Sequence, residues 1–189
     1  MITKISLEKY ISRIKKFLLI EDYDSALLEL ENAIIQYPDT YVLYTNAGNI
    51  YTLRSEYKKA EDYYLKSLTL KKSKEALNNL AHMYVIQGLY DEALKYTSEA
   101  LEIDSLYVDA LFNQALIYER KKELPSAKIQ LDKIINLQPN HAKALILAFK
   151  IAQETCEWDK VEILNQKLDL MIGNGEEHPF INISRVIDN

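Results

Sequence analysis

The chain has 189 residues, of which 48% are hydrophobic, and it contains only four glycines and four prolines, so the composition favours helices over sheets and long loops. The net charge of −5 argues against nucleic-acid binding, because phosphate neutralisation requires clustered lysines and arginines. No apolar run reaches the ~20 residues that span a bilayer, and the single cysteine, Cys156, excludes an intramolecular disulfide. We therefore expect a cytoplasmic protein that binds neither nucleic acid nor membrane.

One residue pattern recurs five times along the chain. A small residue stands at the same place in each copy, at spacings of 34, 33, 34 and 34 residues: Ala26, Ala60, Ala93, Ala127 and, in a looser copy, Val161. An aromatic residue precedes the first four of these by nine positions: Phe17, Tyr51, Tyr84 and Tyr118. A repeat of this length in a helix-favouring sequence predicts a solenoid, in which each unit contacts only its neighbours.

Each copy is predicted to form two helices. In the second copy, Tyr44 and Gly48 share a face of the first helix, and Ala60 and Tyr64 share a face of the second. The small side chains of Gly48 and Ala60 allow the two helices to approach closely, while the aromatic residues fill the space around the contact. Ser55, in the polar break between the helices, is the expected N-cap of the second helix.

These positions resemble the signature of the tetratricopeptide repeat family, W-x2-L-G-x2-Y followed by A-x3-F and P. In the second copy the matching residues are Tyr44, Ala47, Gly48, Tyr51, Tyr57, Ala60 and Tyr64. The resemblance implies an all-α, right-handed superhelical solenoid of five helix-turn-helix repeats over residues 1–172, followed by an apolar C-terminal tail or linker at residues 173–189. The expected repeats cover residues 7–40, 41–73, 74–107, 108–141 and 142–172.

The sequence shows no constellation of catalytic or metal-binding residues. The three histidines, His82, His141 and His178, fall at different phases of the repeat, so nothing brings them together. The sequence has no glycine-rich phosphate loop, metal-ligand spacing or nucleophile motif. We therefore expect that this chain is not an enzyme and uses no cofactor or metal.

The first helices of the repeats, which line the concave surface in this family, contain a regular row of asparagines. Asn46, Asn79 and Asn113 each lie two positions before the small residue of their helix, 33 and 34 residues apart. A carboxamide has one acceptor oxygen and two donor hydrogens, which complement a peptide backbone. We predict that this row binds an extended peptide, together with neighbouring residues Asn49, Asn78 and His82. The alternative is a structural role, in which the asparagines form hydrogen bonds within the protein.

Phe112 belongs to an apolar part of the predicted groove, which also includes Leu116, Ile146 and Leu147. Either an apolar side chain of a ligand or the protein's own tail would cover this part. Chaperone adaptors of the family bind a C-terminal carboxylate through lysine and arginine at the second and fifth places of their first helices. Only Lys143 fits that pattern here, which argues against a carboxylate clamp.

Two functions follow from the resemblance. The first is a protein–protein interaction scaffold, an adaptor that binds an extended peptide or a partner helix in the concave groove. The second is a substrate-recruiting N-terminal arm of a glycosyltransferase whose catalytic domain lies beyond Asn189. It is suggested by Pro179, Phe180 and Asp188, which resemble the segment after the repeats in bacterial relatives of O-linked N-acetylglucosamine transferases. A further alternative is self-association through the exposed last repeat.

Overall fold

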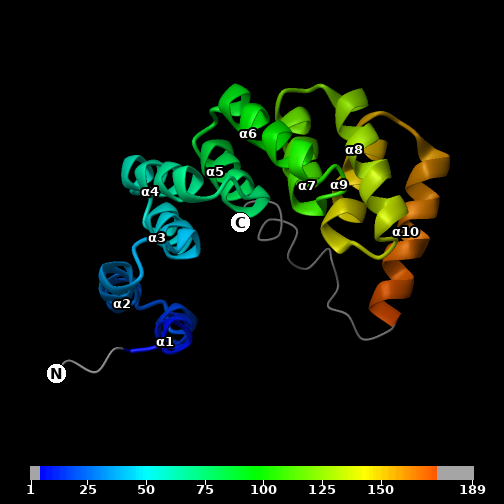
Figure 1. Cartoon of the computed structure of the whole chain (residues 1–189). Helices are drawn as coiled ribbons and strands as arrows, with labels where there is room; N and C mark the ends of the chain where they lie inside the picture. Colours follow the sequence, from blue (N-terminus) through cyan, green and yellow to red (C-terminus); the bar gives the residue numbers. More distant parts are fainter. Residues whose placement is uncertain (1–4, 174–189) are drawn as a thin grey trace. The chain divides into compact units, whose positions relative to one another are not determined.

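The computed structural model describes residues 5–173, and this part of the chain consists of ten α-helices joined by short turns (Figure 1). The helices are α1 (Leu7–Leu19), α2 (Tyr23–Gln36), α3 (Tyr41–Leu53), α4 (Tyr57–Leu70), α5 (Lys74–Ile86), α6 (Tyr90–Ile103), α7 (Val108–Arg120), α8 (Leu124–Leu137), α9 (Ala142–Glu154) and α10 (Trp158–Gly173). The predicted all-α class and the five helix pairs are therefore confirmed. Of the predicted tail, only Gly173 is described, and residues 174–189 lie outside the described part.

The chain divides into two compact units, Met1–Ile103 and Asp104–Asn189 (Figure 1). In the first unit, α1 pairs with α2, α3 with α4 and α5 with α6, while α2 packs on α3 and α4 on α5. The first helices α3 and α5 also contact each other directly. In the second unit, α7 pairs with α8, α9 pairs with α10, and α8 packs on α9. Contacts between neighbours in chain order are the organisation that a repeat predicts.

The recurring small residue lies at the centre of each helix pair. Ala26, Ala60, Ala93 and Ala127 are completely buried, whereas Val161 in α10 is partly exposed. A completely buried alanine on the second helix leaves room for the other helix to approach, because larger side chains would hold the two backbones apart. The steric role inferred from the sequence for Ala60 therefore agrees with its place in the core.

Gly48 of α3 lies directly against the aromatic ring of Tyr64 of α4. A Cβ atom added at Gly48 would lie 2.7 Å from both Cδ1 and Cε1 of that ring, closer than real Cβ contacts occur. Tyr64 is almost completely buried, and its burial raises the pKa of its hydroxyl to about 12. The hydroxyl therefore keeps its proton at neutral pH and can act as a hydrogen-bond donor.

The turn inside every helix pair contains one residue with a left-handed backbone. The φ angles are 56° at Glu21, 60° at Ser55, 74° at Gly88, 62° at Lys122 and 56° at Cys156. In the second repeat the N–H of Glu56 donates to the carbonyl of Tyr51 (2.9 Å) and the N–H of Ser55 to the carbonyl of Thr52 (2.9 Å), which is a Schellman motif. Ser55 thus ends the first helix. Its expected role as N-cap of the second helix was wrong, because Glu56 occupies that position.

Two substitutions test the cost of this backbone geometry. A non-glycine residue in the left-handed region destabilises the folded state by roughly 1–2 kcal/mol. Glycine avoids this strain, but its larger entropy in the unfolded state offsets part of the gain. We expect Ser55→Gly to raise the free energy of unfolding by about 0.5–1 kcal/mol. Gly88→Ala should lower it by about 1 kcal/mol, although a Cβ there would meet open space. Urea denaturation followed by circular dichroism measures both, and two unchanged midpoints would contradict the argument.

The last described helix is polar at two positions where α8 is apolar. Asn165 occupies the position of Leu131, and its Nδ2 donates to Oδ2 of Asp169 (3.1 Å). Asp169 in turn occupies the position of Ile135, and it is exposed where Ile135 is partly covered.

Candidate functional site

The predicted binding residues of the first unit lie on adjacent faces of α3 and α5. Each of these two helices places two polar residues and one aliphatic residue at i, i+3 and i+7, and therefore on one face: Asn46, Asn49 and Leu53 on α3, and Asn79, His82 and Ile86 on α5. The four polar side chains are partly exposed. We call Asn46, Asn49, Asn79 and His82 the amide face. Because α3 and α5 contact each other, the two halves of this face lie side by side.

Asn49 connects the second and third repeats through its carboxamide oxygen. Nδ2 of Asn79 donates to Oδ1 of Asn49 (2.9 Å), and the hydroxyl of Tyr64 donates to the same oxygen (2.7 Å). Thr52 completes the group, since its Oγ1 lies 3.2 Å from the Tyr64 hydroxyl. Hydrogen bonds within the protein are what the structural alternative expects of these asparagines, and Asn49 and Asn79 form them. Asn79 still presents its own oxygen, because the bond to Asn49 uses only its NH2 group.

Asn46 differs from the other two asparagines of the amide face. Within residues 5–173 its carboxamide makes no hydrogen bond, and the side chain is partly exposed, so its donors and acceptor are available to a ligand. Asn78, which we expected beside the row, is 7% exposed and hence buried. His82 follows Asn79 by three positions and remains partly exposed. Of the predicted binding residues in this unit, Asn46, Asn49, Asn79 and His82 are therefore partly exposed and Asn78 is buried.

The remaining predicted residues lie in the second unit, on α7. Asn113 is buried at 6% exposure, whereas Phe112 is partly exposed. The ring of Phe112 packs at a tilt of 43° against the ring of His141, with 5.7 Å between the centroids. His141 is the N-cap of α9, where its Nδ1 accepts from the N–H of Ala144 (3.1 Å). Of the predicted apolar groove, Leu116 is partly exposed, while Ile146 and Leu147 are buried.

Sequence reasoning missed two features of the first helices. In the second unit, Lys150 Nζ donates to Oε1 of the buried Glu119 (2.9 Å). In the first unit, Leu53 and Ile86 are exposed beside the amide face, at 62% and 51%. Their regular spacing was visible in the sequence, but periodic aliphatic residues in a helix normally indicate core positions. Their exposure became evident only in the folded chain.

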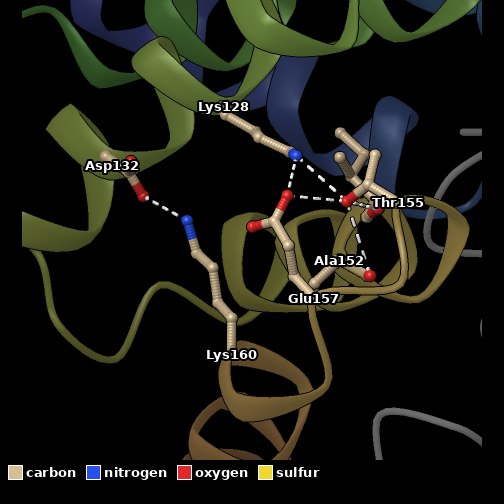
Figure 2. Close-up of polar contacts among 7 residues, drawn as sticks. Lys128, Asp132, Ala152, Thr155, Glu157 and Lys160 are labelled. Carbon is tan, nitrogen blue, oxygen red and sulfur yellow. Dashed lines mark hydrogen bonds and ion pairs between the residues drawn. The ribbon is translucent and has the colours of Figure 1, made fainter.

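Polar contacts hold the fourth repeat to the fifth (Figure 2). Lys128 of α8 forms an ion pair with Glu157 and donates to Oγ1 of Thr155 (3.0 Å), which in turn donates to Glu157 (2.8 Å). Lys160 of α10 donates to Asp132 of α8 (3.1 Å). The hydrogen bond from Lys128, and next the one from Thr155, lower the pKa of the Glu157 carboxyl. Because these contacts join α8 to the turn between α9 and α10, we assign them a structural role.

Two other kinds of feature, a metal centre and a membrane-spanning helix, do not occur among the described residues. Residues 5–173 contain no group of three or more His, Cys, Asp or Glu side chains that is placed to hold a metal ion. None of the ten described helices is both long enough and apolar enough to cross a membrane. The amide face, together with the exposed Leu53 and Ile86 beside it, is the candidate functional site of the described chain.

Comparison with known protein families identifies the repeat. Three models of the tetratricopeptide repeat match residues 43–75, 75–105 and 108–141, which together cover just over half of the chain. The chain is a tetratricopeptide repeat protein. Tetratricopeptide repeats mediate protein–protein interactions, so this tetratricopeptide repeat protein belongs to a class of interaction scaffolds.

Similar proteins extend this assignment. The human protein O-mannosyl-transferase TMTC3 is 29% identical over 158 residues, which are 79% of this chain and 17% of TMTC3. The crystal structure of PilW has a TM-score of 0.79 at 19% identity, covering 91% of this chain and 80% of PilW. YrrB, described as a tetratricopeptide repeat protein with an unusual peptide-binding site, has a TM-score of 0.64 at 20% identity, covering 93% of this chain and 90% of YrrB.

The similarities to solved structures concern the fold of this chain. The identities to the solved structures are low, so the likeness concerns the arrangement of the helices. The chain spans less than a quarter of the length of the curated relatives it matches. The similarity to TMTC3 therefore concerns its repeat region.

Proposed function

We propose that this tetratricopeptide repeat protein is an adaptor that binds an extended peptide of a partner protein on the first helices of its repeats. The observation that supports the proposal is the amide face of α3 and α5, where, among the described residues, the carboxamide of Asn46 and the oxygen of Asn79 make no hydrogen bond. Residues 1–172, with the repeat boundaries expected from the sequence, are proposed as the binding domain. Residues 173–189 are proposed as its tail or linker.

The chemistry of the amide face fits a peptide backbone better than it fits a charged ligand. Asn46 offers two N–H donors and an oxygen acceptor, and Asn79 offers an oxygen acceptor. A peptide group presents the complementary N–H and C=O at every residue. The amide face contains no carboxylate, lysine or arginine. A ligand held in this way would be recognised through its main chain, and other surfaces would add the side-chain specificity.

The test compares the wild-type chain with the triple variant Asn46→Ala, Asn79→Ala and His82→Ala, which changes only residues of the amide face. Purified protein is used to select from random 12-residue peptides displayed on phage, and the selected peptides are measured by fluorescence anisotropy. We expect the triple variant to bind them at least about tenfold more weakly, a loss of roughly 1.4 kcal/mol. Thermal melting shows whether the variant is folded.

Asn32→Ala is the matched control, because Asn32 is an exposed asparagine on α2, a second helix. It should bind the selected peptides like the wild type. Equal binding by the folded triple variant and the wild type would show that the amide face is not the binding site. Failure to select any peptide would reject extended-peptide binding altogether.

The substrate-recruiting arm of a glycosyltransferase is the second candidate function. The similarity to TMTC3, a protein O-mannosyl-transferase by name, favours it. The residues that suggested this function in the sequence, Pro179, Phe180 and Asp188, lie outside the described part. An immunoblot of the native gene product decides between the two. A band at the mass of 189 residues supports the adaptor, and a much larger band supports the arm.

Self-association through the last repeat stays a prediction, which light scattering of the purified chain tests.

A further inference from the structure

An aliphatic residue is exposed at the end of each first helix in the first unit. Leu19, Leu53 and Ile86 are the last residues of α1, α3 and α5, and they follow one another at 34 and 33 positions. They are 84%, 62% and 51% exposed. Single exposed aliphatic residues are ordinary on protein surfaces and need no explanation. Three at the same position of successive repeats form a regular row, which we call the aliphatic row.

The second unit provides an internal comparison. Arg120 and Glu154 occupy the corresponding positions at the ends of α7 and α9, and both are exposed. A charged residue is therefore compatible with this position of the repeat, and helix packing does not require an aliphatic one. The stability of the fold therefore does not explain why the first unit has aliphatic side chains at the ends of its first helices.

The aliphatic row borders the amide face. Leu53 lies four residues beyond Asn49 on α3, and Ile86 lies four residues beyond His82 on α5, so each aliphatic side chain is one helical turn from a polar one. Arg54 follows Leu53, but its guanidinium is engaged with Asp24 (2.5 Å) and Glu56 (2.8 Å). The charge next to Leu53 is thus neutralised, which favours an uncharged group on the ligand.

We propose that the aliphatic row binds the side chains of an extended peptide that has an aliphatic residue at every third position. The proposal rests on the peptide-binding function proposed above and names the class of peptide. The axes of packed helices lie about 8–10 Å apart, and α3 and α5 are packed against each other. Leu53 and Ile86 mark equivalent places on these two helices, so the side chains that they accept must be about 8–10 Å apart.

The length per residue of the bound peptide decides which spacing of its aliphatic residues matches Leu53 and Ile86. One turn of a polyproline II helix contains three residues, spans about 9 Å and returns the side chain to the same face of the peptide. Along a β-strand, residues three apart point to opposite faces, and residues on the same face, two or four apart, are separated by about 7 or 13 Å. A peptide in the polyproline II conformation with an aliphatic residue at every third position therefore places one side chain beside Leu53 and the next beside Ile86, and its main chain runs next to the amide face.

Three fluorescein-labelled 13-residue peptides test this spacing. Each has four leucines in a background of serine and glutamine, and the leucines stand at every second, every third or every fourth position. Fluorescence anisotropy with the full chain gives the dissociation constants. We expect the peptide with leucine at every third position to bind at least about tenfold more tightly than the other two.

The two members of the row that border the amide face are then replaced by Leu53→Gln together with Ile86→Gln, which changes only exposed side chains. In this variant the preference should fall to less than about twofold. Leu28→Gln with Ile35→Gln is the matched control, because both residues are also exposed, at 60% and 78%, but lie on α2, a second helix. The control variant should keep the full preference of the wild type.

The outcomes separate this inference from the proposed function. If peptides selected from the random library bind the amide face but show no spacing of aliphatic residues, and if the Leu53 and Ile86 variant binds them normally, the aliphatic row is not part of the site and the adaptor function stands. If no peptide from either source binds, both proposals are overturned. A preference that survives in the Leu53 and Ile86 variant also overturns the inference.

Discussion

Gly48→Ala is expected to lower the free energy of unfolding by about 2–3 kcal/mol, although alanine is the better helix former. The added Cβ would lie 2.7 Å from two carbon atoms of the Tyr64 ring. That ring cannot move aside easily, since Tyr64 is almost completely buried and its hydroxyl is bonded to Asn49 (2.7 Å). Urea denaturation followed by circular dichroism measures the loss.

A second substitution should remove this cost. The fourth repeat combines Ala115 with Leu131 at the positions of Gly48 and Tyr64, so a smaller partner side chain is compatible with alanine. In a Tyr64→Leu background, we expect Gly48→Ala to be neutral or to stabilise the chain by up to about 1 kcal/mol. An equal loss in both backgrounds would show that the Tyr64 ring is not the cause.

Ala60→Leu is expected to lower the free energy of unfolding by about 2 kcal/mol. Ala60 is completely buried on α4, so three additional carbon atoms have no space unless α3 and α4 move apart. Val161 is the matched control, because it occupies the same position in α10 but is partly exposed. Val161→Leu should change the stability by less than about 0.5 kcal/mol. Similar midpoints of thermal unfolding for both variants would contradict the proposed crossing.

The sequence predicted the repeat better than it predicted the ends of the helices. Ala26, Ala60, Ala93 and Ala127 alone defined the period, because close helix packing restricts these positions to small residues. Ser55 was assigned to the wrong helix end. Serine is a common N-cap, and only the backbone geometry shows that here it takes the left-handed position that Gly88 occupies in the third repeat.

The candidate site was predicted in part. The period placed Asn46 and Asn79 at equivalent positions, but it could not show that Asn79 donates to Asn49 while Asn46 makes no side-chain hydrogen bond within residues 5–173. These bonds depend on side chains of neighbouring repeats, 30 residues apart for Asn49 and Asn79. The sequence also did not show which side chains are buried. Asn78 and Asn79 are adjacent in sequence, yet only Asn79 is accessible.

The sequence by itself determined the all-α class, the 34-residue period and the family, because helix packing leaves a local pattern of small and aromatic residues that repeats along the chain. Only the tertiary structure decided which amides remain available and that Leu53 and Ile86 are exposed. The physical reason is that exposure and hydrogen bonding depend on what a neighbouring repeat covers, and a residue pattern within one helix does not contain that information.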